Sequence, residues 1–102
     1  MILLLKVNYT FEHARAVFEK YQEILSKLQV PDFMKQKGPY WYSGSGDDGG
    51  AFLFYEFDRA NFSEAYDYLI KIQRMYHGVP SFKREIIVGY DAEDMQRTTP
   101  PN

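Results

Sequence analysis

The chain of 102 residues contains no cysteine, and it has only two histidines and one tryptophan. Without cysteine there can be no disulfide, no thiolate nucleophile and no metal site with cysteine ligands. An excess of one charge is also missing, because 12 basic and 14 acidic residues leave a formal net charge of −2. Proteins that follow the phosphates of nucleic acids need surplus Lys and Arg, so this balance argues against a nucleic-acid partner.

Long hydrophobic runs are absent as well. The opening MILLL is interrupted by Lys6, which makes it too short for a membrane span or a signal peptide. We therefore expect a cytoplasmic protein without a membrane partner. What the chain does have is 45% hydrophobic and 18% aromatic residues, enough for one folded domain with a real core.

The predicted elements follow the order strand, helix, strand, strand, helix, strand. Strands are expected at 1–9, 39–43, 51–58 and 82–90. Apolar side chains at steps of three and four predict the helices, namely Phe11, Ala14, Phe18, Tyr21, Leu25 and Leu28 in the first, and Phe62, Ala65, Leu69, Ile72 and Tyr76 in the second.

This order predicts a ferredoxin-like α+β fold, with a four-stranded antiparallel sheet and two helices on one face. Right-handed crossovers would place strands 1–9 and 51–58 in the middle of the sheet. We expect this domain to span residues 1–91, followed by a flexible polar tail at 92–102. The segment 30–40 is expected to be a long connection with exposed Phe33 and Met34, either a plain loop or a lid or arm.

The stretch GSGDDG at 44–49 fits the dinucleotide pattern G-x-G-x-x-G, but it lies between two predicted strands. A phosphate site of that type needs a helix directly after the glycines. Asp47 and Asp48 would also repel a phosphate. We interpret the stretch as a hairpin turn, and we expect no cofactor and no metal.

Strand alternation divides the side chains between two faces of the sheet. The helix-covered face would take Leu3, Leu5, Val7, Tyr9, Leu53, Tyr55, Phe57, Phe82, Ile86, Val88 and Tyr90. The opposite face would take Ile2, Leu4, Lys6 and Asn8, then Phe52, Phe54, Glu56 and Asp58, then Lys83, Glu85, Ile87 and Gly89. Either Trp41, or Tyr40 with Tyr42, should flank its edge.

We further expect strands 1–9 and 51–58 to run parallel, with 82–90 antiparallel to them. This would gather the apolar residues at one end, namely Ile2, Leu4, Phe52, Phe54 and Ile87. The polar residues would gather at the other end, namely Lys6, Asn8, Glu56, Asp58, Lys83 and Glu85. An apolar patch of this size should be covered, and a second copy of the chain packed sheet against sheet is the expected cover.

A small-molecule cavity between sheet and helices is compatible with such a homodimer. Its expected ligand-binding side chains are Lys6, Tyr40, Trp41, Tyr42, Phe54, Lys83 and Glu85. Glu56 and Asp58 are the candidates for acid–base chemistry, because the sequence offers neither a cysteine nor a poised histidine. Asn8 is the third candidate catalytic residue. Paired ionic structure is the competing interpretation of the two carboxylates.

The element order and the two-sided apolar strands resemble the dimeric α+β barrel superfamily over about residues 1–91. The likeness extends to its small members in which a glycine-rich hairpin such as GSGDDGG precedes a strand such as AFLFYEF. The resemblance implies a homodimer paired through its sheets. Members include cofactor-free oxygenases, isomerases, haem-degrading enzymes and proteins of no known activity. Asn8 and His77 loosely match the haem-degrading pattern, but Trp41 belongs to a different strand.

A cofactor-free monooxygenase or isomerase is the alternative function, and an RNA-binding module is a third. GGAFLFYEF at 49–57 is similar to the third strand of an RNA-recognition motif, with Phe52 at one base-stacking position. Gly50 stands where the second ring is expected, and Asp48 where a basic residue is expected. With the acidic net charge, we expect no nucleic acid partner.

Overall fold

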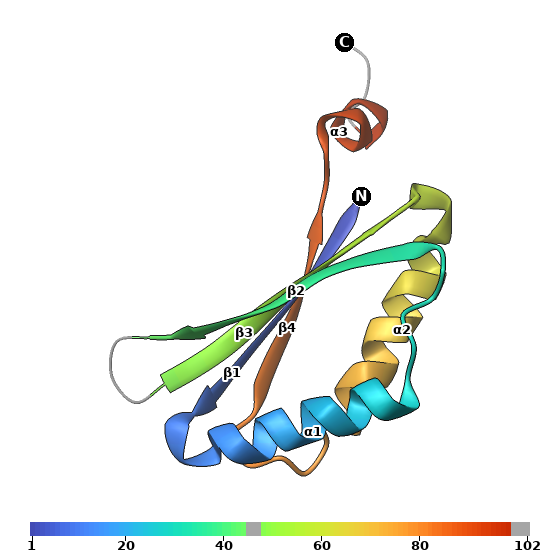
Figure 1. Cartoon of the computed structure of the whole chain (residues 1–102). Coiled ribbons are helices and arrows are strands. Elements are labelled where there is room, and N and C mark those ends of the chain that lie inside the picture. Colours follow the sequence, from blue (N-terminus) through green and yellow to red (C-terminus); the bar gives the residue numbers. More distant parts are fainter. Residues whose placement is uncertain (45–47, 99–102) are drawn as a thin grey trace.

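The structure is a computed structural model that describes residues 1–44 and 48–98. Its four strands are β1 (Ile2–Thr10), β2 (Met34–Ser43), β3 (Asp48–Phe57) and β4 (Lys83–Gly89). The helices are α1 (Ala14–Lys27), α2 (Phe62–Met75) and α3 (Ala92–Thr98), with short 3-10 turns η1 (Phe11–His13) and η2 (Arg59–Asn61). The strands form one sheet in the order β2-β3-β1-β4 (Figure 1).

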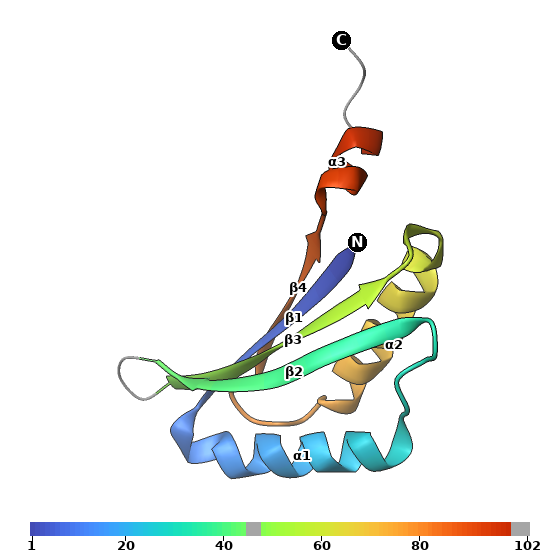
Figure 2. The ribbon, with the colours of Figure 1, turned by 45° about the horizontal axis from the view of Figure 1, so that its top comes forward.

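Both long helices lie on the same side of the sheet, and the other side stays open (Figure 2). Strand alternation builds the core between them: Leu3 and Tyr55 from the central strands are fully buried, as are Val17 of α1 and Leu69 of α2. Burial of these side chains provides the main driving force for this two-layer arrangement. The predicted α+β class is confirmed, and the topology is compatible with the ferredoxin-like fold.

The direction of the central strands differs from the prediction. β1 pairs antiparallel with both β3 and β4, and β2 pairs antiparallel with β3. The reason is topological: the α1 crossover makes β1 and β2 parallel, and the hairpin then turns β3 back. The predicted division of the open face into an apolar end and a charged end is therefore wrong. Glu56 lies opposite Ile2, and Phe52 lies opposite Lys6.

The buried side of α1 is rotated by one residue from the predicted stripe. Val17 and Ile24 are buried, whereas Phe18 and Leu25 are about half exposed at 45% and 53%. Apolar residues occupy both 17 and 18 and both 24 and 25, so two overlapping stripes satisfy the helical period. The β-branched side chains, Val17 and Ile24, take the buried side. Phe18 instead contacts Trp41 edge to face, with ring centroids 5.7 Å apart.

The solvent-facing side of α1 carries a three-membered ion pair. Lys20 and Lys27 lie 2.8 and 2.9 Å from the Glu23 carboxylate, and hydrogen bonds from them lower its pKa to about 2. A lowered folded-state pKa stabilises the fold above the ordinary carboxyl pKa, and this contribution disappears as pH falls toward 2.

We therefore expect Glu23→Gln to lose less stability than the unmodified chain between roughly pH 5 and pH 2. Urea midpoints at several pH values would measure this difference. Glu19→Gln is the matched control, because Glu19 makes only a 3.7 Å contact with Arg15 on the same helix. If the urea midpoints of all three proteins fall in parallel between pH 5 and pH 2, the lowered pKa of Glu23 does not contribute to stability.

Strand β2 begins five residues earlier than predicted, at Met34 rather than Pro39. Met34 is buried and pairs with Phe57, so the segment 30–40 is largely strand rather than a long loop. The register shifts between Lys37 and Tyr40, and Pro39 lies within that irregularity, where its missing N–H interrupts no regular ladder. The polar alternation of Lys35 and Lys37 is typical of an edge strand.

The hairpin predicted between the second and third strands is present. Ser43 pairs with Gly49, so β2 and β3 form the expected hairpin, although turn residues 45–47 lie outside the described residues.

At the far end of β4, residues 92–98 form helix α3, where the sequence predicts a flexible polar tail. α3 extends beyond the sheet, away from α1 and α2 (Figures 1 and 2). Its buried Asp94 lies 3.0 Å from the amino group of Met1.

Candidate functional site

The open face consists of four rows of side chains that cross the strands in the order β2, β3, β1, β4. The rows are Lys35, Glu56, Ile2 and Gly89; Lys37, Phe54, Leu4 and Ile87; Tyr40, Phe52, Lys6 and Glu85; and Tyr42, Gly50, Asn8 and Lys83. Apolar and aromatic residues occupy a band through the middle. Charged residues lie at two diagonally opposite corners, one formed by Lys35, Lys37 and Glu56 and the other by Lys6, Lys83 and Glu85. The structure thus brings together on this face all five residues expected at a dimer interface.

Aromatic rings dominate this band. Phe52 lies 5.5 Å from Tyr40, 6.0 Å from Tyr42 and 5.7 Å from Phe54, measured between ring centroids. The contacts are tilted or edge to face, the arrangements that aromatic pairs favour. Tyr40 is 50% exposed and Ile87 is 40% exposed, so the band is only partly shielded by its own packing.

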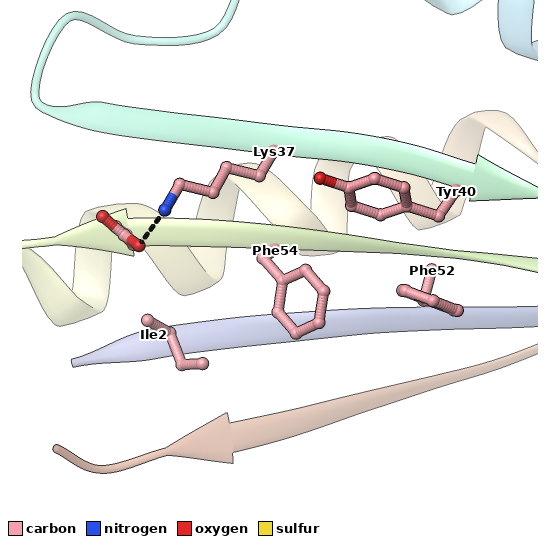
Figure 3. A pocket seen from close by; sticks show the side chains of 6 residues that line it. Ile2, Lys37, Tyr40, Phe52 and Phe54 are labelled. Carbon is pink, nitrogen blue, oxygen red and sulfur yellow. Dashed lines mark hydrogen bonds and ion pairs between the residues drawn. The ribbon is translucent and has the colours of Figure 1, made fainter.

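Two shallow hollows lie on either side of Phe52 and Phe54, which line both of them. The first has a volume of about 490 Å³ and is bounded by Ile2, Tyr40, and the Lys37–Glu56 pair (Figure 3). The second has a volume of about 430 Å³ and lies toward Leu4, Lys6 and Tyr42. Phe52 and Phe54 therefore form a ridge between two depressions.

The candidate carboxylates occupy different environments. Glu56 accepts a 2.8 Å hydrogen bond from Lys37, and that bond lowers the pKa of Glu56. The lowered pKa favours the ionised form, which suits an ion pair or a general base rather than a proton donor. Asp58 lies beyond the end of β3, where its carboxylate accepts a hydrogen bond from Ala60 N–H and caps η2. Its predicted place on the open face is therefore wrong.

The remaining predicted residues fall on both sides of the sheet. Asn8 donates a 2.9 Å hydrogen bond to the Tyr42 hydroxyl on the open face. Trp41 lies on the helix side instead, where its ring contacts Tyr9 and Tyr21. Of the two predicted possibilities for the edge of the open face, Tyr40 with Tyr42 is therefore correct and Trp41 is not.

The charge of the open face differs from that of the chain. Lys6, Lys35, Lys37 and Lys83 face Glu56 and Glu85, which gives the face a net charge of +2, whereas the whole chain carries −2. Lys6 and Glu85 occupy paired positions on β1 and β4. Both corners therefore contain cations together with an anion that could pair with groups on another surface.

A second candidate site lies between the sheet and the helices. A cavity of about 40 Å³ is lined by Tyr21, Tyr55, Tyr68 and Tyr76, by Gln36, and otherwise by aliphatic side chains. Tyr21 comes from α1, Tyr55 from β3 and Tyr68 from α2, Tyr76 caps the C-terminus of α2, and Gln36 comes from β2. Within residues 1–44 and 48–98, no side-chain nitrogen or oxygen that is shielded from solvent lacks a hydrogen-bond partner.

Burial controls the chemistry of these phenols. It raises the pKa of Tyr55, and the neighbouring hydroxyls of Tyr68, Tyr76 and Tyr21 raise it further. Burial likewise raises the pKa of Tyr76, of Tyr68 and of Tyr21. All four therefore stay protonated at neutral pH and can donate a hydrogen bond.

A cavity between sheet and helices was predicted, and Tyr55 and Tyr76 were predicted to lie in the core, but none of the seven predicted ligand-binding residues lines this cavity. The hydroxyl groups were the available indication, because Tyr21, Tyr55 and Tyr76 occupy predicted core-facing positions and bring polar atoms inside. Periodicity cannot show that these groups converge, since they come from three separate elements. Gln36 lies in a segment for which the sequence predicts a connection rather than a strand.

In the part of the chain that the structure describes, no helix is long and apolar enough to cross a membrane. Over the same residues, no group of three or more His, Asp or Glu side chains could hold a metal ion. A comparison with known protein families found no matching family model, and a comparison with curated proteins found no match either.

Proposed function

We propose that this chain forms a homodimer through the open faces of two sheets and binds a small apolar or aromatic molecule between its sheet and helices. This is the assembly of the dimeric α+β barrel superfamily. The observation that carries the proposal is the aromatic band on a face that neither long helix covers. Isolated apolar side chains are common on protein surfaces, but a contiguous band of this kind typically marks an interaction site.

The size of the open face supports a second copy as its partner. Strands lie about 4.8 Å apart and alternate residues about 6.8 Å apart, so the 16 positions cover a footprint of about 500 Å². Two such faces together would bury about 1,000 Å², which is the lower limit for a specific interface. The face is therefore large enough for a dimer, and further contacts outside it would strengthen the association.

The relief of the face supports an isologous contact, in which the same patch meets itself. The ridge of Phe52 and Phe54 is flanked by a hollow on each side. In a twofold dimer, the ridge of one copy can lie in a hollow of the other, and both corners offer lysines and a glutamate to the facing rim. A partner with a flat surface would leave both hollows unfilled.

Sedimentation equilibrium of the purified full chain at micromolar concentration tests the dimer. We expect a mass of twice the 12.0 kDa of one chain. A mass of 12.0 kDa throughout the micromolar range would overturn the dimer part of the proposal. Native mass spectrometry on protein purified under mild conditions would report any retained small molecule in the same experiment.

A further inference from the structure

We infer that the hollow between Tyr40 and the Lys37–Glu56 pair binds an aromatic carboxylate at the margin of the dimer interface. This site is distinct from the cavity between sheet and helices, and the inference rests on the proposed homodimer, because the partner's sheet would close the hollow. The hollow has a volume of about 490 Å³ in the single chain, within the range of roughly 300–1,000 Å³ that is typical of ligand pockets. It therefore admits a small molecule without any rearrangement of the chain.

The position of this hollow on the open face leaves it free in a twofold dimer. The residues at the centre of the face all line the second hollow, namely Phe54, Leu4, Phe52 and Lys6. The first hollow instead extends from the ridge to the outer row and to edge strand β2, through Ile2, Glu56, Lys37 and Tyr40. A contact centred on the face therefore places the partner's ridge in the second hollow. Since each copy has one ridge and two hollows, the first hollow remains unfilled beneath the partner's sheet.

Aromatic rings form the apolar part of this hollow. Between ring centroids, Tyr40 lies 5.5 Å from Phe52 and 6.4 Å from Phe54, and Phe52 lies 5.7 Å from Phe54. Tyr40 is 50% exposed and both phenylalanines are only partly buried, so the rings still present surface to the hollow (Figure 3). A flat aromatic body can contact these rings edge to face or offset, which are the arrangements that aromatic pairs favour. The lining therefore favours an aromatic ligand over a small polar one.

The polar groups of the hollow lie beside these rings and favour a negative charge on the ligand. Lys37 donates a hydrogen bond of 2.8 Å to Glu56, and a lysine ammonium has three N–H donors, so two remain for a ligand. Lys35 occupies the position opposite Glu56 on β2, so two lysines share a single carboxylate at this corner. A ligand carboxylate balances this excess of positive charge, whereas an ammonium group would add to it.

The exposure of this corner keeps the cost of binding an anion low. The side chains of the Lys37–Glu56 pair are 50% and 46% exposed, so a carboxylate beside them stays near water while the ring of the ligand lies against the ridge. A charge that lost its hydration completely would be costly. The Tyr40 hydroxyl points along β2 toward Lys37 and can donate a second hydrogen bond to the same carboxylate (Figure 3).

Three probes test the inference: 2-naphthoate, which is aromatic and anionic; 2-naphthamide, which has a similar shape without the charge; and acetate, which has the charge without the rings. Each is titrated into the full chain labelled with nitrogen-15, and the backbone amide shifts of Lys37, Tyr40 and Phe54 report binding in the hollow. We expect 2-naphthoate to bind about 5-fold more tightly than 2-naphthamide, the effect of one exposed ion pair. Acetate should cause no shifts at millimolar concentration, because it makes no ring contacts.

Lys37→Met removes the ammonium and keeps an unbranched side chain at the wall of the hollow. We expect this variant to bind 2-naphthoate at least about 5-fold more weakly and to bind 2-naphthamide unchanged. Lys83→Met is the matched control, because it removes the same charge from the opposite corner of the open face and Lys83 does not line the hollow. It should leave both affinities unchanged. Urea denaturation of the two variants checks their fold, since both replace exposed side chains.

Sedimentation equilibrium of the same samples, with and without 2-naphthoate, separates this inference from the proposed function. A dimer that binds both naphthalene probes equally, that binds neither, or that dissociates when 2-naphthoate binds would overturn the inference and leave the homodimer in place. Equal weakening by the two lysine variants, or shifts confined to helix-side residues such as Leu53 and Ile72, would overturn it as well. A monomer without ligand would instead contradict the homodimer, and with it the closed site. A dimer whose affinity for 2-naphthoate falls in Lys37→Met but not in Lys83→Met would support both.

Discussion

Replacing Phe54 by aspartate is expected to convert the proposed homodimer into a folded monomer. Phe54 lies in the second row of the open face, between Lys37 and Leu4, and it forms half of the ridge that the two hollows share. Phe54 is already partly buried in the single chain, so completing its burial contributes about 1 kcal/mol, and a twofold interface contains two of them. Losing both raises the dissociation constant about 30-fold, before the cost of burying two carboxylates is added.

Sedimentation equilibrium of Phe54→Asp at micromolar concentration measures this change, and circular dichroism verifies the fold. Tyr66→Asp is the control, because Tyr66 is similarly aromatic and 38% exposed but lies on the outer side of α2. The control should remain a dimer. A dimeric Phe54→Asp, or equal dissociation of both variants, would show that the subunits associate through another surface.

The second large effect is expected at Gly50. A β-carbon added there would lie 2.4 Å from the Tyr42 ring and hydroxyl and 2.5 Å from the carbonyl oxygen of Val7. The ring could move, but the carbonyl belongs to the central strand β1 and cannot. Gly50→Ala should therefore lower the free energy of unfolding by about 2 kcal/mol, in the range found for overpacked interiors. Urea denaturation of the monomeric Phe54→Asp background would measure it without a contribution from association.

A double variant separates the two clashes at Gly50. Tyr42→Ala with Gly50→Ala removes the ring and keeps the contact with Val7, so it should be destabilised relative to Tyr42→Ala alone. Gly50→Ala is compared with Gly50 in two backgrounds, the chain with Tyr42 and the chain with Tyr42→Ala. If alanine does not lower the free energy of unfolding in either background, the close approach of β1 and Tyr42 to this position is not a constraint on the fold.

The element order was predictable because its determinants are local. The alternation of Leu3, Leu5 and Val7 requires a strand with one buried face, and the stripe from Phe62 to Tyr76 requires a helix. The orientation of α1 was not predictable, since Val17 and Phe18 satisfy the same period and only the space above the sheet distinguishes them. Strand β2 was missed at its start because Lys35 and Lys37 read as loop residues unless their pairing with β3 is known.

The residues that β1 and the middle of β3 contribute to the open face could be predicted, but their pattern could not. Alternation alone assigns Ile2, Leu4, Phe52 and Phe54 to one side of the sheet, and register then decides which of them meet. Reversing the direction of β3 exchanges the neighbours of Phe52 and Glu56, which is why the expected polar end does not exist. Gly50 itself has no side chain, and the ring of Tyr42 from the adjacent strand lies over its position. A comparison of one strand at a time cannot reveal this.

One strand of this sheet contributes to both candidate surfaces. Successive residues of β3 point in opposite directions, so Leu53 and Tyr55 wall the cavity while Phe52 and Phe54 form the ridge. In the proposed homodimer, a guest that displaces the backbone here would change how readily two copies associate, and association would change the affinity for the guest by the same factor. Occupancy and assembly would then be coupled across the thickness of a single β-strand.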